Sequence, residues 1–186
     1  RIAVFCASRP GLDDALTKAA YDAGHWLASH GIGVVYGGGG SGLMGSVSSG
    51  ALDAGGEVIG VIPQSMIDRE WGRHDITELH VVDTMHERKA LMAELSDAFV
   101  AVPGGIGTLE ELIEVFTWAQ LGMHRSPVAL FNLAGYYDGL IDFFDHATRE
   151  GFLREPTRAA LVIEDEPDAL LQALRGYEPL DVPRWI

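Results

Sequence analysis

Short runs of apolar residues alternate with longer segments of helical periodicity along the whole chain of 186 residues. These runs are continuously apolar rather than alternating, which is typical of strands that helices cover on both faces. Because strands and helices alternate, the crossovers are right-handed and the strands are parallel. We therefore predict an α/β fold, a doubly wound parallel sheet with helices on both faces. The predicted strands are residues 2–7, 33–36, 57–62, 79–82, 98–102, 128–131 and 160–163, and the predicted helices are residues 13–29, 43–54, 85–96, 109–120, 136–150 and 167–174.

The size and composition predict a single domain. The chain is long enough to bury a substantial core, and its hydrophobic (47%) and charged (22%) residues are in ordinary proportions. We assign residues 1–186 to one domain, with an aperiodic loop or lid at residues 63–78 and an irregular tail at residues 177–186. No apolar run approaches the ~20 residues of a membrane span, and the lone Cys6 fits a reducing compartment. We expect no membrane span, no signal peptide and a cytoplasmic location.

The charge balance limits the partners of the chain. The formal net charge is −14, which repels nucleic acid polymers and anionic lipid surfaces at long range. We therefore expect neither a nucleic acid nor a membrane partner. A small anionic ligand has to be held by local N–H groups and a few arginines.

One glycine-rich turn, Pro-Gly-Gly-Ile-Gly-Thr at residues 103–108, links an apolar strand to a helix. Such a turn lets backbone N–H groups approach a ligand, and the helix dipole favours negative charge there. We assign phosphate binding to Gly104, Gly105, Gly107 and Thr108. Carboxylates follow directly, which favours an enzyme acting on a phosphorylated sugar over a passive nucleotide clamp.

A second glycine-rich turn, residues 37–45, contains the pattern G-x-G-x-x-G. A dinucleotide site also requires an acidic residue at the end of the next strand, and none follows here. The turn can also be a tight bend that lets Gly45 pack against a helix. We favour a third interpretation, in which Gly39 and Gly42 line a mononucleotide site.

Two cations, Arg88 and Lys89, lie on the apolar stripe of a predicted helix. Long side chains on such a stripe often reach past it to water. Because this helix starts just after a strand end, its first turn is instead expected to face the ligand crevice. We therefore count Met85, Arg88 and Lys89 among the candidate site residues.

Glu111 has two interpretations. Thr108 and Glu111 have the S/T-x-x-E spacing of a capping box, in which the glutamate bonds to the N–H of the threonine. The alternative is catalysis, and the spacing alone does not decide between them. Glu110 either binds ribose hydroxyls or faces solvent.

These motifs together carry a family resemblance. Residues 103–111 resemble the PGGxGTxxE signature of the LOG family, the cytokinin riboside 5′-monophosphate phosphoribohydrolases often labelled lysine decarboxylase-like. Residues 35–45 and 85–89 are similar to two further blocks of that family, in the same order. The resemblance implies a Rossmann-like fold, a homodimer, and Arg88 and Glu111 as the catalytic pair. Residues 6–9 read Cys-Ala-Ser-Arg where similar proteins often read CGSS; Ser8 is kept and is expected to touch substrate, whereas Arg9 adds a charge near the phosphate.

Other chemistries find little support in the residues. A pyridoxal phosphate decarboxylase requires a lysine for the Schiff base, but Lys18 is remote from the glycine turns and Lys89 has no assigned partner for the pyridine ring. The histidines are scattered without metal-ligand spacing, and no G-x-S-x-G elbow is present. We expect no cofactor and no metal.

The resemblance implies hydrolysis of the N-glycosidic bond of adenosine 5′-monophosphates, with or without an N6 substituent, to the free base and ribose 5-phosphate. The sugar becomes positively charged in the transition state, so Glu111 is assigned to the ribose. Arg88 is assigned to the base side or to orienting the nucleotide. The alternative is a Rossmann-like carrier or sensor that binds nucleotide without turnover.

Overall fold

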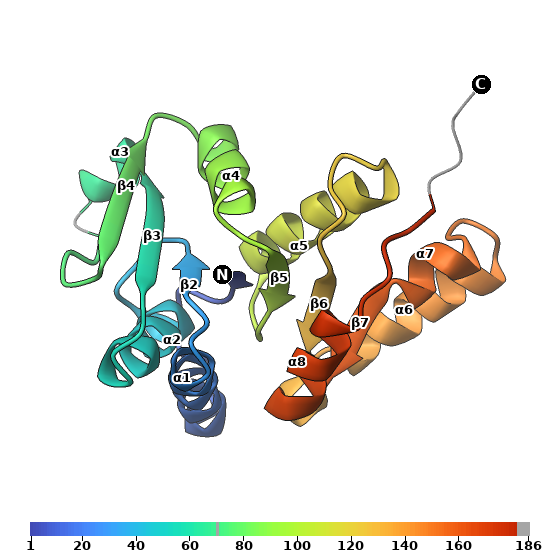
Figure 1. Ribbon diagram of the computed structural model, residues 1–186, viewed down its shortest axis with the longest axis horizontal. Helices are drawn as coiled ribbons and strands as arrows, with labels where there is room; N and C mark the ends of the chain where they lie inside the picture. Colours follow the sequence, from blue (N-terminus) through green and yellow to red (C-terminus); the bar gives the residue numbers. More distant parts are fainter. Residues whose placement is uncertain (70, 182–186) are drawn as a thin grey trace.

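A seven-stranded, fully parallel sheet forms the centre of the computed structural model, which describes residues 1–69 and 71–181 (Figure 1). The spatial order is β4-β3-β2-β1-β5-β6-β7. This confirms the predicted parallel sheet. The strands are β1 (Ile2–Phe5), β2 (Val34–Tyr36), β3 (Val58–Pro63), β4 (Glu78–Val82), β5 (Ala98–Ala101), β6 (Val128–Phe131) and β7 (Leu161–Glu164).

Helices cover both faces of the sheet and bury two apolar cores (Figure 1). On one face, α1 (Asp14–Ser29), α2 (Gly42–Asp53) and α8 (Pro167–Arg175) pack on strand residues such as Val4. On the other face, α4 (Met85–Glu94), α5 (Ile106–Gln120) and α6 (Asp138–Arg149) pack on residues such as Ala3. Successive strand residues thus enter opposite cores, which is why the central strands β1, β2, β5 and β6 are apolar at every position. No helix in the described residues is both long and apolar enough to cross a membrane.

The strand order reverses between β1 and β5, and this switch point positions the site. β1 continues along the chain to β2 on one side and pairs with β5 on the other. Beyond the strands, the N–H of Ala7 donates to the carbonyl oxygen of Pro103 at 3.3 Å, so the two following loops run side by side. In open α/β sheets, ligands bind outside the carboxyl ends of the strands at such a point.

Three short helical elements lie where the sequence predicted loops. The region 63–78 contains helix α3 (Gln64–Ile67) and the first residue of β4, so it is only partly the predicted aperiodic lid. Helix α7 (Glu155–Ala159) was not predicted, and the 3-10 helix η1 (Leu133–Gly135) precedes α6, which begins two residues later than predicted. Residues 177–181 of the predicted tail carry no helix or strand, and residues 182–186 lie outside the described residues.

Helices α1 and α2 pack through glycines at their contact. A Cβ atom on Gly24 would lie 2.0 Å from the carbonyl oxygen of Val47, and one on Gly50 would lie 2.0 Å from that of Tyr21. Both obstacles are backbone atoms, which cannot swing aside as a side chain can. The two helices therefore approach each other only because these positions lack side chains.

We expect the Gly50→Ala variant to lose about 1–3 kcal/mol of unfolding free energy, because the methyl group forces α1 and α2 apart. Urea denaturation followed by circular dichroism measures the change. Gly139→Ala in α6 is the matched control, because nothing lies within 4 Å of a Cβ atom there. The control should change the unfolding free energy by less than about 0.5 kcal/mol, because Gly139 is exposed in the first turn of α6. Equal effects of the two substitutions would contradict close packing at Gly50.

Candidate active site

A cavity of about 650 Å³ opens at the carboxyl ends of the central strands. This volume lies within the range of small-molecule sites. Its walls come from the loop after β1, the glycine turn after β2, the lid after β3, and the first turns of α4 and α5. The lining residues are Cys6, Ala7, Ser8, Arg9, Gly37, Gly39, Ser41, Met44, Ile62, Met66, Trp71, Met85, Arg88, Gly105, Ile106, Gly107, Thr108 and Glu111.

The structure brings most of the predicted site residues into this one cavity. Four of them lie outside its lining: Gly42, Lys89, Gly104 and Glu110. The predicted residues that line it are Ser8, Gly39, Met85, Arg88, Gly105, Gly107, Thr108 and Glu111. Their contacts with a substrate stay predictions.

Two of the residues outside the lining shape the loops around the cavity. Gly42 has a φ of +59°, and a Cβ atom on it would lie 2.4 Å from the backbone nitrogen of Arg9. A side chain at Gly42 would thus push the loop after β1 off the start of α2. A Cβ atom on Gly104 would lie 2.0 Å from Oγ1 of Thr108. Both positions require glycine for close packing.

The N-terminus of α5 faces the cavity without a capping side chain. The helix begins at Ile106, and its N-cap residue Gly105 has no side chain to satisfy the first N–H groups. These groups have no partner within a helix, and together with the helix dipole they favour an anion. Thr108 is already the third helical residue, so Glu111 lies too far along the helix for a capping box. The capping interpretation of Glu111 is wrong.

Arg88 and Glu111 form a buried ion pair at the wall of the cavity. Nη1 of Arg88 lies 3.2 Å from Oε1 of Glu111, and each side chain is 6% exposed. Arg88 also donates from Nε to the carbonyl oxygen of Val61 at 3.0 Å and from Nη2 to that of Gly37 at 3.2 Å. The guanidinium group is thus held inside the fold, so the interpretation that Arg88 only reaches past the apolar stripe to water is wrong.

Gly37 makes room for this arginine. A Cβ atom on Gly37 would lie 1.9 Å from Nη2 of Arg88. The second glycine-rich turn therefore serves the ion pair directly, in addition to lining the cavity. The sequence offered no signal for this role, since the two residues lie 51 positions apart.

Burial controls the proton affinities around the pair. Burial raises the pKa of Glu111, and the charge of Arg88 opposes the shift without cancelling it. Burial also raises the pKa of Cys6, with a further contribution from Glu111. The Cys6 thiol therefore stays protonated, which makes it a poor nucleophile.

Lys89 points away from the cavity and links two helices. Its ammonium group pairs with Glu110 and, at 2.8 Å, with Oε2 of Glu114. Burial lowers the pKa of Lys89, but the hydrogen bonds to the two carboxylates outweigh this effect and the pKa is raised. Lys89 and Glu110 thus connect α4 to α5 outside the cavity. The structure does not place these two predicted site residues in the cavity lining.

The lid after β3 supplies lining residues that were not predicted. Met66 and Trp71 face the cavity, and Trp71 is 53% exposed. The backbone of the lid pairs antiparallel with the glycine turn at Gly39 and Gly72. Arg73 anchors it further by donating to the carbonyl oxygen of Gly45 at 3.1 Å. In the sequence, only the aperiodic tract at residues 63–78, which contains Trp71, indicated this wall of the cavity.

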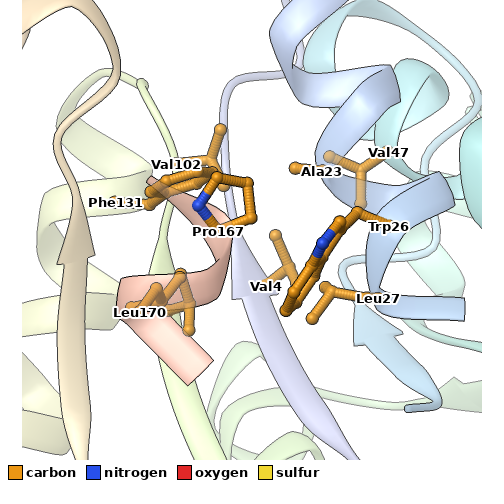
Figure 2. A pocket seen from close by; sticks show the side chains of 10 residues that line it. Val4, Ala23, Trp26, Leu27, Val47, Val102, Phe131, Pro167 and Leu170 are labelled. Carbon is orange, nitrogen blue, oxygen red and sulfur yellow. The ribbon is translucent and has the colours of Figure 1, made fainter. Parts of the chain in front are cut away.

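A second cavity, of about 20 Å³, lies in the core that α1, α2 and α8 cover, between α1 and α8. Figure 2 shows Trp26 and Leu27 of α1 facing Pro167 and Leu170 of α8, with Val4 between them. This volume is close to that of one water molecule. All of its lining side chains are apolar, so it offers no group for orienting a ligand. We therefore take the large cavity as the candidate active site.

Comparisons with known proteins agree on one family. The family model described as possible lysine decarboxylase matches residues 44–174. A cytokinin riboside 5′-monophosphate phosphoribohydrolase of Arabidopsis thaliana is 48% identical over 179 residues, which cover 96% of this chain and 83% of the relative. A phosphoribohydrolase of the same description from Oryza sativa subsp. japonica is also 48% identical, with 96% of this chain and 74% of the relative covered.

Solved structures at lower identity share the fold. A molybdenum cofactor carrier protein of Chlamydomonas reinhardtii has a TM-score of 0.68 at 22% identity, with 94% of each chain covered. The fold and the site thus define a single-domain Rossmann-like protein with its ligand cavity at the switch point of the sheet. Within that class, the chain belongs to the LOG family, as the motifs indicated.

The lysines do not fit the description of the family model. The chain has two lysines. Lys18 is exposed on α1, where it pairs with Asp22, and Lys89 is enclosed by Glu110 and Glu114. Neither lysine lines the cavity. Because a pyridoxal phosphate enzyme needs a lysine within the site, these residues do not fit that cofactor.

Proposed function

We propose that this chain hydrolyses the N-glycosidic bond of adenosine 5′-monophosphates, including N6-substituted ones, to the free base and ribose 5-phosphate. The observation that carries this proposal is the buried pair of Arg88 and Glu111 beside the uncapped N-terminus of α5. The names of relatives at 48% identity support it. Residues 1–186 act in this proposal as one catalytic domain.

The phosphate and the ribose occupy the wall formed by α5. The N–H groups and hydroxyl of the first turn, at Gly105, Gly107 and Thr108, hold the 5′-phosphate. This places the ribose one turn further along α5, at Glu111. Cleavage gives the sugar oxocarbenium character, which the carboxylate of Glu111 stabilises. Water adds its hydroxyl to C1′, and a proton goes to the departing base.

The base is assigned to the apolar lining residues that the loop after β3 and the start of α4 supply. Met66, Trp71 and Met85 line this side and offer a surface for a purine. Nη1 of Arg88 lies 3.9 Å from Sδ of Met85 and 3.2 Å from Oε1 of Glu111. In this proposal the charge of Arg88 stabilises the negative charge that develops on the departing base. Arg88 also keeps Glu111 in place. Arg9 lines the cavity as well and counteracts the acidic field of the chain near the phosphate.

The direct test is incubation of the protein with AMP and, separately, with N6-isopentenyl-AMP, with chromatography of the released base. We expect release of free base and an equal amount of ribose 5-phosphate. The ratio of the two rates measures the preference for the N6 substituent. A thermal shift with nucleotide but no released base would instead establish a carrier or sensor.

The pH profile of the reaction should report the raised pKa of Glu111. Because burial favours the protonated acid, Glu111 ionises above the ordinary glutamate value of about 4.3. We expect kcat, measured at saturating AMP, to fall as the pH drops through this raised pKa. An acid limb in the ordinary glutamate range would contradict a raised pKa of Glu111 in the enzyme–substrate complex.

The assembly proposed is a homodimer. Exposed apolar side chains at Ile113 on α5 and at Leu121, the C-cap residue of this helix, supply a surface that association would cover. Light scattering coupled to gel filtration measures the mass. The proposed compartment is the cytoplasm, where the free thiol of Cys6 stays reduced.

A further inference from the structure

Two consecutive tyrosines hold the turn that precedes α5. The hydroxyl of Tyr136 donates to the carbonyl oxygen of Gly104 at 2.8 Å, and that of Tyr137 donates to the carbonyl oxygen of Val102 at 2.7 Å. Tyr137 is buried, whereas Tyr136 is about half exposed. Neither tyrosine lines the cavity. The mechanism above uses neither of them.

The hydrogen bond from Tyr136 controls the direction of a neighbouring N–H group. The carbonyl of Gly104 and the N–H of Gly105 belong to the same peptide unit. In a planar trans peptide these two groups point in opposite directions. Because Tyr136 holds the oxygen on its own side, the N–H of Gly105 points the other way. Gly105 lines the cavity.

This peptide unit needs an external restraint. It lies between two glycines, whose backbone dihedrals rotate at little steric cost. Nothing lies within 4 Å of a Cβ atom on Gly105, so packing does not restrain the unit at the Gly105 end. If the peptide rotated, the carbonyl oxygen of Gly104 would face the phosphate, where it repels instead of donating.

We propose that Tyr136 is a positioning residue for phosphate binding, whose hydroxyl fixes the Gly104–Gly105 peptide so that the N–H of Gly105 donates to the 5′-phosphate. This inference rests on the proposed function, because the phosphate is that of the proposed substrate. It assigns a role to a residue 32 positions away from the glycine turn.

Tyr137 provides a matched control one residue away. Its acceptor, the carbonyl of Val102, belongs to the peptide bond with Pro103. Proline has no N–H, so this hydrogen bond cannot orient a donor toward the ligand. Burial raises the pKa of Tyr137, which keeps it a protonated donor to the core. Tyr137→Phe therefore removes the same hydroxyl from the same turn without touching a phosphate donor.

The test compares Tyr136→Phe with Tyr137→Phe in the full chain. We expect Tyr136→Phe to raise KM for AMP about tenfold, as expected for a lost hydrogen bond to a charged group, and to change kcat less than about twofold. Affinity for inorganic phosphate, measured by calorimetry, should weaken by a similar factor. Tyr137→Phe should lower the melting temperature and leave KM and phosphate affinity unchanged.

Two outcomes would overturn the assignment. If Tyr136→Phe leaves both KM and phosphate affinity unchanged, the hydroxyl does not position the N–H of Gly105. If both variants raise KM equally, the tyrosines support the turn in general. Should the wild-type protein release no base, the proposed function fails, whereas the calorimetry with inorganic phosphate still decides the role of Tyr136.

Discussion

The Glu111→Gln variant should lose about 10²–10⁴-fold in kcat and keep most of its affinity for AMP. The carboxylate acts on a positive charge that exists only in the transition state, so its removal raises the barrier without weakening the ground-state complex. Glutamine has nearly the same shape, and its amide oxygen can still accept from Nη1 of Arg88. The measurements are kcat from released base and the dissociation constant of AMP by calorimetry.

Glu114→Gln is the matched control for this substitution. Glu114 lies on the same helix but pairs with Lys89 outside the cavity. The same change from carboxylate to amide there should leave kcat close to that of the wild type. An equal loss of kcat and of AMP affinity in Glu111→Gln would show that Glu111 supports the fold of the cavity and not the reaction.

Glu111 also links stability to pH, in a direction set by its raised pKa. Because the folded pKa lies above the unfolded one, protonation favours the folded state. This contribution is fully present below the unfolded pKa and is lost as the pH rises through the folded pKa. Glu111→Gln should therefore flatten the pH dependence of stability between these two pKa values. In the proposed mechanism this carboxylate is kept at a cost in stability, as expected for a catalytic group.

The sequence predicted the sheet and the approximate place of the site because those depend on local patterns. Continuous apolar runs identify buried strands, and the glycine turn after residues 98–102 indicated the end of the sheet where the large cavity opens. The start of α5 was placed three residues late, since Gly107 has a low helix propensity. In the first turn of a helix the N–H groups have no partner to lose, so the glycine is tolerated there.

Contacts between distant parts of the chain determine which of the predicted site residues reach the cavity, and the sequence could not predict these contacts. Arg88 and Lys89 share one stripe of α4, and both are buried, but only Arg88 lines the cavity. Carbonyl oxygens of β3 and of the glycine turn hold Arg88, whereas acidic residues on α5 hold Lys89. These partners come from distant parts of the chain, so periodicity within α4 could not tell the two cations apart. The contact from Tyr136 to Gly104 was unpredictable for the same reason.

Removing Arg88 from the ion pair should be more damaging than removing Glu111, and the Arg88→Met variant tests this. It leaves Glu111 buried without its counter-charge and leaves the carbonyl oxygens of Val61 and Gly37 without this donor. Loss of one partner of a buried ion pair typically costs about 3–5 kcal/mol. The pKa of Glu111 should rise further, because burial is then no longer opposed. We expect kcat, measured from released base, to fall by at least about 10²-fold. Urea denaturation of the same preparations measures the loss of unfolding free energy.

The double variant Arg88→Met with Glu111→Gln separates the structural role of the pair from its chemical role. Replacing Glu111 by a neutral side chain removes the uncompensated charge that destabilises Arg88→Met, so the double variant should recover part of the lost stability. Its activity should stay as low as that of either single variant, because both groups act in the transition state. If activity returned together with stability, the pair would serve only to hold the cavity open. If neither returned, the loss of the hydrogen bonds from Arg88 to Val61 and Gly37 would dominate, and the charge of Glu111 would be a minor factor in the stability of the fold.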